Sequence, residues 1–369
     1  MGAFLDKPEI VREEFREAKG PLDAAMCSIQ GWRVGQEDAH IVKHGLGEGL
    51  EDVSLFCVFD GHGGESMSAA VSKEFVEAVR SGLVKYAAEQ GATGKALITT
   101  PAAFEATLPS AFVNLDRELH RRVVSGTLKE SGTTAVCVFV TPTHVICANS
   151  GDSRAIMVSK DVVIPLSFDH KPSNAVERTR IYAAGGVVSM DRVDGDLAVS
   201  RAFGDFRYKE CASKSWEEQK VSVLPDIVVR PRDPTADQFI VVACDGIWDV
   251  MTNDEVGSAA NALARRGATP DATSEFIIDE CMRRNSRDNM SAIVVSMDAA
   301  PTASKEAVKS FEAARRDANQ ARAERSARGD PMDATSTYAL RMISTYSSAG
   351  AAEEAAEATE EPAAAAGSA

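Results

Sequence analysis

The sequence lacks several features that would place the protein outside the cytoplasm. It has seven cysteines but no Cys-x-x-Cys pair, and most of the cysteines lie in apolar runs. We therefore expect buried, reduced thiols and an intracellular protein rather than a disulfide framework. No signal peptide opens the chain, and no apolar run is long enough to cross a bilayer. The sequence thus predicts no transmembrane segment.

Basic residues are also in short supply. The chain has 40 Lys and Arg against 55 Asp and Glu, which gives a net charge of −15. This balance argues against nucleic acid or an anionic membrane surface as a partner, and it is compatible with the binding of divalent cations. At 369 residues and 44% hydrophobic content, the chain can bury one large core or two ordinary ones. We expect a monomer.

Short apolar runs separated by short turns predict an antiparallel fold. The runs 133–140, 144–148 and 155–158 follow one another with only a few residues between them. Connections of this length cannot hold a crossover helix, so neighbouring strands should be antiparallel. Residues 65–80 and 101–124 have apolar side chains at helical spacing and predict helices that cover a sheet. The fold class is therefore expected to be α+β.

The two ends of the chain differ in composition from the middle. Residues 1–22 are charged and short of β-formers, which predicts an N-terminal arm. Residues 299–329 are charged and favour a helix, and residues 330–369 are small and polar with an Ala/Glu-rich end. We expect a helical extension followed by a disordered tail. Gly82 is expected to end the first covering helix.

Four aspartates stand where buried strands meet turns. Asp60 and Asp245 each end an apolar run and precede glycine, Asp152 follows glycine, and Asp288 precedes the last strand. Each could be a simple turn residue. When Asp152 is considered in isolation, that interpretation is the favoured one. Strand ends cluster at one edge of a sandwich, where four carboxylates would repel one another unless cations were bound. Oxygen ligands without paired Cys or His favour Mg²⁺ or Mn²⁺.

Such a site could hydrolyse phosphate esters. Two ions about 3.5–4 Å apart that share a carboxylate can lower the pKa of a bridging water. Arg33 lies near Glu37 and Asp38, and the group is either a surface ion pair or a guanidinium fork that grips phosphate beside metal-binding acids. His62 could protonate a leaving oxygen. These residues together predict metal-assisted phosphoester hydrolysis.

Other phosphatase classes lack their signatures here. The Asp60-Gly61-His62 triplet is not the D-x-D of haloacid-dehalogenase-type enzymes, and the chain has no G-x-x-x-x-G-K-[ST] loop. No cysteine lies in a phosphate-cradling loop closed by arginine, as a cysteine-based phosphatase requires.

Nine short motifs follow one another along the chain. They are Met1 to Pro8, Gly31-Trp32-Arg33 with Glu37-Asp38-Ala39-His40, Phe59 to Gly64, Ser131 to Ala135, Gly151 to Arg154, Asp169 to Pro172, Leu197 to Asp205, Ala243 to Asp249 and Ser286 to Ser291. In this order they resemble the motifs of the metal-dependent protein phosphatases, the PP2C or PPM family. The first resembles the start of the animal alpha/beta branch. The resemblance covers residues 23–298.

The resemblance implies a fold and a reaction. The fold is an α-β-β-α sandwich of two antiparallel sheets covered by helices, with a flap at about residues 169–220. The reaction is hydrolysis of phosphoserine and phosphothreonine in proteins with two Mn²⁺ or Mg²⁺ ions, in which a metal-bridging hydroxide attacks phosphorus in line. A catalytically silent PP2C-like scaffold is the alternative, but it should have lost acids at the metal positions, and all are present here.

The resemblance also assigns roles to single residues. The metal ligands are Asp60, which bridges the ions, the Gly61 carbonyl, Asp245 and Asp288. The residues expected around them are Glu37 and Asp38, which hold metal-bound waters, Arg33 for the substrate phosphate, His62 as general acid, Asp152 with Asp245 at a weaker third metal site, and Thr134 and Asp249 near the site.

Three positions need separate treatment. Gln36 replaces a methionine common in the family, and we expect no consequence. The chain after Asp298 does not resemble the long helical domain of the animal branch beyond its first helix. Gly2 lacks the Ser or Thr at position six of the usual N-myristoylation motif, since the chain has Asp6. The motif therefore argues against the modification, whereas the animal branch is modified despite the same Asp6, so both states of Gly2 stay open. We expect a cytoplasmic protein, with the nucleus as a further location, and a weakly membrane-associated fraction if Gly2 is myristoylated.

Overall fold

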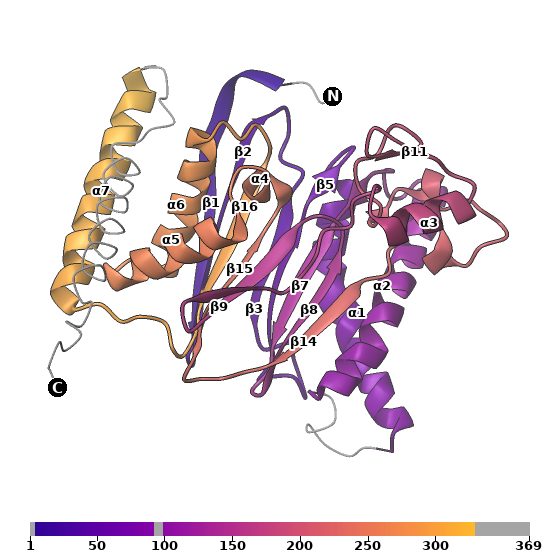
Figure 1. Cartoon of the computed structure of the whole chain (residues 1–369), viewed down its shortest axis with the longest axis horizontal. Helices are drawn as coiled ribbons and strands as arrows, with labels where there is room; N and C mark the ends of the chain where they lie inside the picture. Colours follow the sequence, from indigo (N-terminus) through magenta and orange to yellow (C-terminus); the bar gives the residue numbers. More distant parts are fainter. Residues whose placement is uncertain (1–3, 92–98, 329–369) are drawn as a thin grey trace, which may run out of the picture.

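Two β-sheets lie face to face, and helices cover the outer face of each (Figure 1). The structure, a computed structural model, describes residues 4–91 and 99–328. All pairs of named strands in these ranges are antiparallel. The predicted α-β-β-α sandwich is confirmed.

The first layer pair consists of a five-stranded sheet and two long helices. The strands, in spatial order, are β14 (Asp226–Pro231), β8 (His144–Ser150), β7 (Ala135–Val140), β4 (Ser54–Phe59) and β3 (Ala39–His44). The helices that cover it are α1 (Ser66–Glu89) and α2 (Pro101–Val124).

The second layer pair consists of a six-stranded sheet and the C-terminal helices. The strands, in spatial order, are β1 (Phe4–Lys19), β2 (Leu22–Arg33), β16 (Met290–Ser296), β15 (Asp237–Ala243), β9 (Arg154–Ser159) and β10 (Val162–Pro165). The helices on its outer face are the short α4 (Asp245–Trp248), α5 (Asn253–Arg265) and α6 (Pro270–Arg283), and α7 (Lys305–Arg328) packs outside α5 and α6 (Figure 1).

Burial on both faces explains the unbroken apolar runs of the central strands. In β4, Phe56 and Val58 pack into the core between the sheets, while Cys57 and Phe59 pack beneath α1 and α2. Alternate residues of a strand face opposite sides, so a strand between two cores needs apolar residues at every position. Asp60 follows directly where both cores end.

The first covering helix is longer than predicted. Gly82 does not end α1, which continues to Glu89. A Cβ atom at Gly82 would lie 2.5 Å from Cγ2 of Thr107 on α2. Gly82 therefore serves the close approach of the two helices, and the cost of one glycine inside a helix is small, about 1 kcal/mol.

The charged N-terminal segment is an edge strand, and the prediction of an arm for residues 1–22 was wrong. Strand β1 pairs with β2 from Phe4↔Arg33 to Lys19↔Leu22, and the turn contains Gly20 at φ +60°. Backbone pairing and ion pairs hold this strand: Arg12 lies 2.6 Å from Asp279 of α6. Charged side chains suit an exposed sheet edge because they oppose pairing with other chains.

Residues 169–220 form a small lobe beside the five-stranded sheet, and we keep the name flap for them. The lobe contains α3 (Ala175–Ala183) and the short hairpin of β11 (Val188–Ser189) and β12 (Arg192–Val193), with a core of its own. A separate three-stranded ribbon joins it to the site: β13 (Phe203–Gly204), β6 (Gly132–Thr133) and β5 (Gly61–His62).

Three remaining predictions concern the cysteines, the membrane and the chain ends. All seven cysteines are unpaired, and six are buried. In the described ranges, no helix has the length and apolar character needed to cross a membrane. Helix α7 falls in the predicted helical extension. Gly2 and the predicted tail 330–369 lie outside the described residues.

Candidate active site

Asp60 is fixed at the end of β4 by a reciprocal contact with Thr134. The Thr134 amide donates to the Asp60 carbonyl over 2.9 Å, and the Asp60 amide donates to Thr134 Oγ1 over 3.2 Å. Thr134 Oγ1 also lies 2.7 Å from Oγ of Ser153, the residue after Asp152. Thr134 therefore does more than lie near the site, because it holds the backbone of the central acid.

The predicted acids gather around Asp60. Burial raises the pKa of Asp60 well above its usual range, and the nearby carboxylates of four other aspartates raise it further: Asp245, Asp38, Asp152 and Asp288. The pKa of Asp245 is raised in the same way, by burial and then by Asp152, Asp288 and Asp249. The structure thus brings together every aspartate that the sequence predicted for the site.

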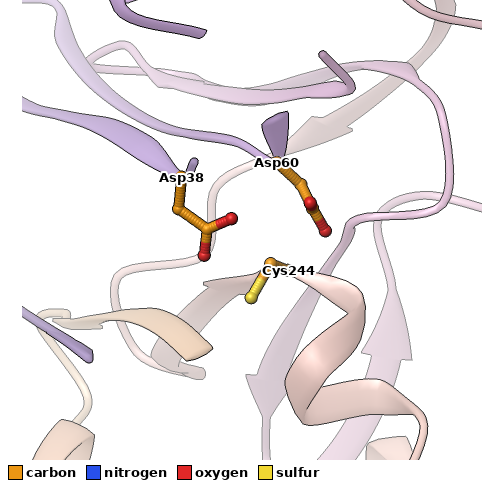
Figure 2. A group of neighbouring side chains, drawn as sticks. All are labelled: Asp38, Asp60 and Cys244. Atoms are coloured by element: carbon orange, nitrogen blue, oxygen red, sulfur yellow. The ribbon is translucent and has the colours of Figure 1, made fainter. Parts of the chain in front are cut away.

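Asp38, Asp60 and Cys244 offer ligand atoms that all lie within 4.8 Å of one another, and Figure 2 shows the three side chains converging. The Cys244 thiol donates to the Asn289 carbonyl over 3.5 Å and accepts from the Ser291 amide over 3.1 Å. Burial and the neighbouring acids raise the pKa of this thiol well above its usual range. Because only a thiolate is a good metal ligand, Cys244 remains a neutral neighbour and the donor set consists of oxygens.

The residues present fit a hard divalent cation. Asp38 Oδ2 accepts a 2.6 Å hydrogen bond from Ser291 Oγ, whereas Asp38 Oδ1 is buried without a hydrogen-bond partner in the described part of the chain. A buried carboxylate oxygen without a partner is costly, and water coordinated to a cation beside Asp60 would satisfy it. Burial raises the pKa of Asp38 to about 6.

Gly61 is required by a close approach of two loops. A Cβ atom there would lie 2.2 Å from the Glu37 carbonyl oxygen. Ser68 Oγ donates to this same carbonyl over 2.5 Å, and the Glu37 amide donates to Asn289 Oδ1 over 3.0 Å. The backbone of Glu37 is therefore held against the Asp60 turn, where the sequence placed it.

Arg33 contacts a different acid from those the sequence suggested. Its Nη2 lies 2.5 Å from Oδ2 of Asp288, rather than pairing with Glu37 or Asp38. Its Nε is buried and has no hydrogen-bond partner within the described ranges, while 37% of the side chain is exposed. One end of the guanidinium thus contacts an acid of the predicted metal site, and other donors remain for an incoming anion.

His62 forms an ion pair that the sequence did not reveal. Its Nε2 lies 2.6 Å from Oδ2 of Asp205. Burial lowers the pKa of His62, but the Asp205 carboxylate outweighs this effect and the net shift is upward. Asp205 belongs to the motif Leu197 to Asp205, which was recognised without a role for this residue.

Lys171 is a second residue that sequence reasoning missed. Its ammonium group forms an ion pair with the buried Asp152 carboxylate, and the acids Asp152 and Asp245 raise its pKa against the effect of burial. The motif Asp169 to Pro172 contained the signal, since it holds a lysine two positions after an aspartate. Asp249, whose pKa is raised by burial and by acids including Asp152, joins the same cluster.

A chain of hydrogen bonds supports Asp38 from behind. Gln36 Nε2 donates to Ser28 Oγ over 2.7 Å, Ser28 Oγ lies 2.8 Å from Ser291 Oγ, and Ser291 Oγ donates to Asp38 Oδ2. We call these residues the Gln36 relay. Gln36 was predicted to be without consequence, yet its side chain occupies the outer end of this chain. Asn289 braces the same loops by donating to the Gln30 and Gly35 carbonyls.

Comparisons with known proteins identify the family of the chain. Residues 22–290 match the family model described as protein phosphatase 2C. The chain is 38% identical over 312 residues to protein phosphatase 1B of Mus musculus, which covers 84% of this chain and 79% of that protein. It is 39% identical over 308 residues to protein phosphatase ppm-1.A of Caenorhabditis elegans, which covers 82% of this chain and 64% of that protein.

Solved structures show the same fold. A crystal structure of a phosphatase from a pathogenic strain of Toxoplasma gondii superposes with a TM-score of 0.63 at 26% identity, over 75% of this chain and 92% of that one. The structure of a Caenorhabditis elegans sex determining protein superposes with a TM-score of 0.63 at 25% identity, over 79% of this chain and 68% of that one. The chain therefore belongs to the protein phosphatase 2C family, a family of protein phosphatases.

Proposed function

We propose that this protein phosphatase hydrolyses phosphoserine and phosphothreonine in proteins and that it depends on two hard divalent cations, Mn²⁺ or Mg²⁺. The observation that carries the proposal is the cluster around Asp60, where burial and then the carboxylates of four neighbouring aspartates raise the Asp60 pKa. Five carboxylates so close together, and shielded in part from water, favour positive charge among them.

The residues that would hold the ions follow from the cluster and the family resemblance. Asp60 would be shared between them, the Gly61 carbonyl would serve one, and Asp245 and Asp288 the other. Glu37 and Asp38 would accept hydrogen bonds from coordinated water. In this chemistry two hard cations stabilise charge on the phosphate and lower the pKa of a shared water, so that hydroxide is available for in-line attack near neutral pH.

The protein's own groups bind the phosphate and move a proton. Arg33, already anchored on Asp288, would orient the phosphate oxygens with its remaining donors. As the new P–O bond forms and the bond to the serine or threonine oxygen breaks, that oxygen keeps the electron pair and takes a proton from His62. The neutral imidazole is then reprotonated from solvent.

The proposal also includes a third cation site, the substrates and the location of the protein. Asp152 and Asp245 would form a weaker third cation site, and the Lys171 ammonium already lies against Asp152. The substrates would be phosphoproteins handled by a monomer in the cytoplasm and nucleus. Myristoylation of Gly2 would add a weakly membrane-bound fraction.

The test is phosphate release from a phosphothreonine peptide with Mn²⁺ or Mg²⁺, with and without EDTA. We expect activity that requires metal and falls by several orders of magnitude in Asp60→Asn and Asp245→Asn. Asp298→Asn is a matched control, because Asp298 lies beyond the opposite end of β16 from Asp288 and pairs with Arg232. A wild-type protein inactive with both metals would favour the silent scaffold instead.

A further inference from the structure

We propose that Asp205 is a positioning residue that holds the His62 imidazole in place for proton donation to the leaving oxygen. The inference rests on the proposed function, in which His62 is the general acid. Asp205 touches neither the substrate nor the predicted metal ligands in this assignment, and it acts only through the 2.6 Å contact with His62 Nε2.

The three-stranded ribbon creates this contact. His62 on β5 lies opposite Gly132 on β6, and Gly204 on β13 lies opposite the same Gly132 from the other side. The histidine and the residue after Gly204 therefore occupy the two edges of the ribbon, with one central residue between them. Residues 143 positions apart in the chain meet across a single glycine.

Gly132 has to be glycine for the pair to form. A Cβ atom at this position would lie 2.2 Å from His62 Nε2 and 2.3 Å from Asp205 Oδ2. Real Cβ atoms do not approach other heavy atoms so closely, so any side chain would push the imidazole and carboxylate apart. The missing side chain is the space in which the ion pair lies.

The backbone of Asp205 is held firmly. Asp205 has a left-handed conformation with φ +51°, which costs energy for a residue other than glycine and must be imposed by its surroundings. Its amide donates to the carbonyl of Ser131, the residue before Gly132, over 3.1 Å. The Asp205 carbonyl in turn accepts from the Tyr208 amide over 2.9 Å, so main-chain contacts on both sides hold the residue whose carboxylate meets His62.

A buried charge supports this turn from the helix layer. Asp116 of α2 accepts from the Gly204 amide over 2.7 Å, from Lys209 Nζ over 2.6 Å and from Trp216 Nε1 over 2.6 Å. The side chains of Asp116 and Lys209 are both fully buried. The turn that presents Asp205 is therefore fixed between α2 and the flap.

The pairing decides which imidazole nitrogen does the chemistry. With Nε2 bonded to Asp205, Nδ1 is the nitrogen left to meet a substrate, and it has no hydrogen-bond partner elsewhere in the described chain. A carboxylate in this position fixes ring orientation and stabilises the protonated imidazole, as in other histidine-dependent enzymes. Removing the carboxylate should leave His62 present but poorly oriented.

The test compares two substrates that differ in their leaving group. Asp205→Gly removes the carboxylate and tolerates the left-handed backbone, and Asp205→Asn keeps an acceptor oxygen at the same position. For a phosphothreonine peptide we expect Asp205→Gly to lower kcat by about 10- to 100-fold, a part of the roughly 10²–10⁴-fold that a positioned acid supplies, with KM nearly unchanged. Asp205→Asn should restore part of the loss. For p-nitrophenyl phosphate, whose leaving group needs no proton, both variants should resemble wild type.

Controls separate this inference from the function on which it rests. Asp161→Gly also replaces an aspartate with left-handed backbone, at φ +61° in the β9–β10 hairpin, and should leave both activities unchanged. Thermal unfolding of each variant accompanies the kinetics, and Asp205→Asn carries the comparison if the glycine variant does not fold.

Equal losses on the two substrates, or no loss on the peptide, would overturn the role of Asp205. If His62→Gln loses peptide activity while the Asp205 variants do not, the proposed function survives and only this inference fails. A wild-type protein that releases phosphate from neither substrate would remove the proposed function itself.

Discussion

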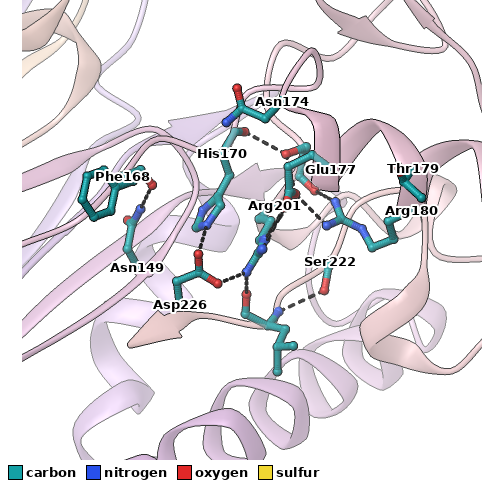
Figure 3. Close-up of polar contacts among 12 residues, drawn as sticks. Asn149, Phe168, His170, Asn174, Glu177, Thr179, Arg180, Arg201, Ser222 and Asp226 are labelled. Carbon is teal, nitrogen blue, oxygen red and sulfur yellow. Dashed lines mark hydrogen bonds and ion pairs between the residues drawn. The ribbon is translucent and has the colours of Figure 1, made fainter. Parts of the chain in front are cut away.

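The Arg201 guanidinium grips the Glu177 carboxylate inside the flap, with Nη2 2.7 Å from Oε1 and Nε 3.2 Å from Oε2. Arg201 Nη1 also lies 2.7 Å from Asp226 Oδ1 on β14, and Asp226 Oδ2 lies 3.1 Å from His170 Nε2 (Figure 3). This network, buried at Glu177, Arg201 and His170 but exposed at Asp226, joins helix α3 of the flap to the edge strand of the five-stranded sheet. The position of the flap beside the five-stranded sheet therefore depends on charged groups as well as on apolar packing.

The first prediction is that Glu177→Gln destabilises the protein and does so in a pH-dependent way. Burial alone would raise the pKa of Glu177, but Arg201 and Arg180 lower it from its ordinary 4.5 to about 2. A carboxylate whose folded pKa is depressed adds stability above its unfolded pKa and loses it as the pH falls through the folded value. The shift corresponds to about 3 kcal/mol at neutral pH.

Urea unfolding at pH 7, 4 and 3 measures this effect. The stability difference between wild type and Glu177→Gln should be full at pH 7 and should shrink steadily between pH 4.5 and 2. Glu210→Gln, an exposed change at the same lobe, should show no difference at any of these pH values. A difference that stays constant with pH would mean that the ion pair is not its cause.

The second prediction concerns the metal-free protein, in which Asp60→Asn should be more stable than wild type. Asp60 is buried among other acids that raise its pKa, so its charged form opposes folding when no cation is present. Replacing it by a neutral side chain of the same shape removes this repulsion. We expect a Tm higher by several degrees in EDTA, as stability and function often oppose each other at active sites.

Adding Mn²⁺ should reverse the order of the two proteins. Wild type should gain stability with metal concentration, because a ligand that binds only the folded state stabilises it by mass action. Asp60→Asn should gain little. Asp298→Asn again provides the control. A wild-type Tm that does not respond to millimolar Mn²⁺ would contradict the presence of a metal site in this cluster.

The third prediction separates the inner and outer ends of the Gln36 relay. Ser291→Ala removes the 2.6 Å hydrogen bond to Asp38 and should raise the Mn²⁺ concentration for half-maximal activity by about 10-fold, the lower range for groups that orient metal ligands. Gln36→Met removes the contact with Ser28 and the longer 3.4 Å hydrogen bond from the Asp38 amide, and it should raise this concentration less than about threefold, since neither contact reaches the Asp38 carboxylate. Manganese titrations of peptide hydrolysis measure both values. Equal effects of the two changes would show that Gln36 contributes as much as Ser291.

The strand-end acids could be predicted from the sequence because their signal is local. A continuous apolar run that ends in Asp-Gly marks both the strand and the residue at its end, as at Asp60 and Asp245. Two such runs in an antiparallel sandwich indicate that the two aspartates lie at the same edge of the sandwich. The two sheets, the covering helices and the main acids of the proposed metal site follow from this kind of pattern.

The remaining features depend on contacts between distant residues. Asp205 lies beside a two-residue strand, too short for any periodicity, and meets His62 across 143 positions. Strand β1 looked like an arm because its stability comes from β2 and from ion pairs such as Arg12 with Asp279, 267 positions away. Local propensity cannot reveal a strand that is held in this way.

The fourth prediction is that α7 can be detached without loss of catalysis. Phe311 is 7% exposed and packs with Leu263 of α5 and Phe276 of α6 in a small core of its own. Arg315 adds ion pairs to Glu275 and Asp271 of α6. These contacts lie on the outer side of α5 and α6, whereas the acids of the site lie between the sheets.

Phe311→Ala should therefore weaken the docking of α7 by about 3–5 kcal/mol, the usual cost of removing a buried phenylalanine side chain, and leave peptide hydrolysis within twofold of wild type. Hydrogen exchange should show faster exchange in residues 305–321 and little change in β4, β15 and β16. Arg316→Ala, on the exposed side of the same helix, should alter neither exchange nor activity. A loss of activity that parallels the faster exchange would contradict the prediction. It would mean that undocking α7 disturbs the sheet beneath α5 and α6, and that the helix supports the catalytic sandwich.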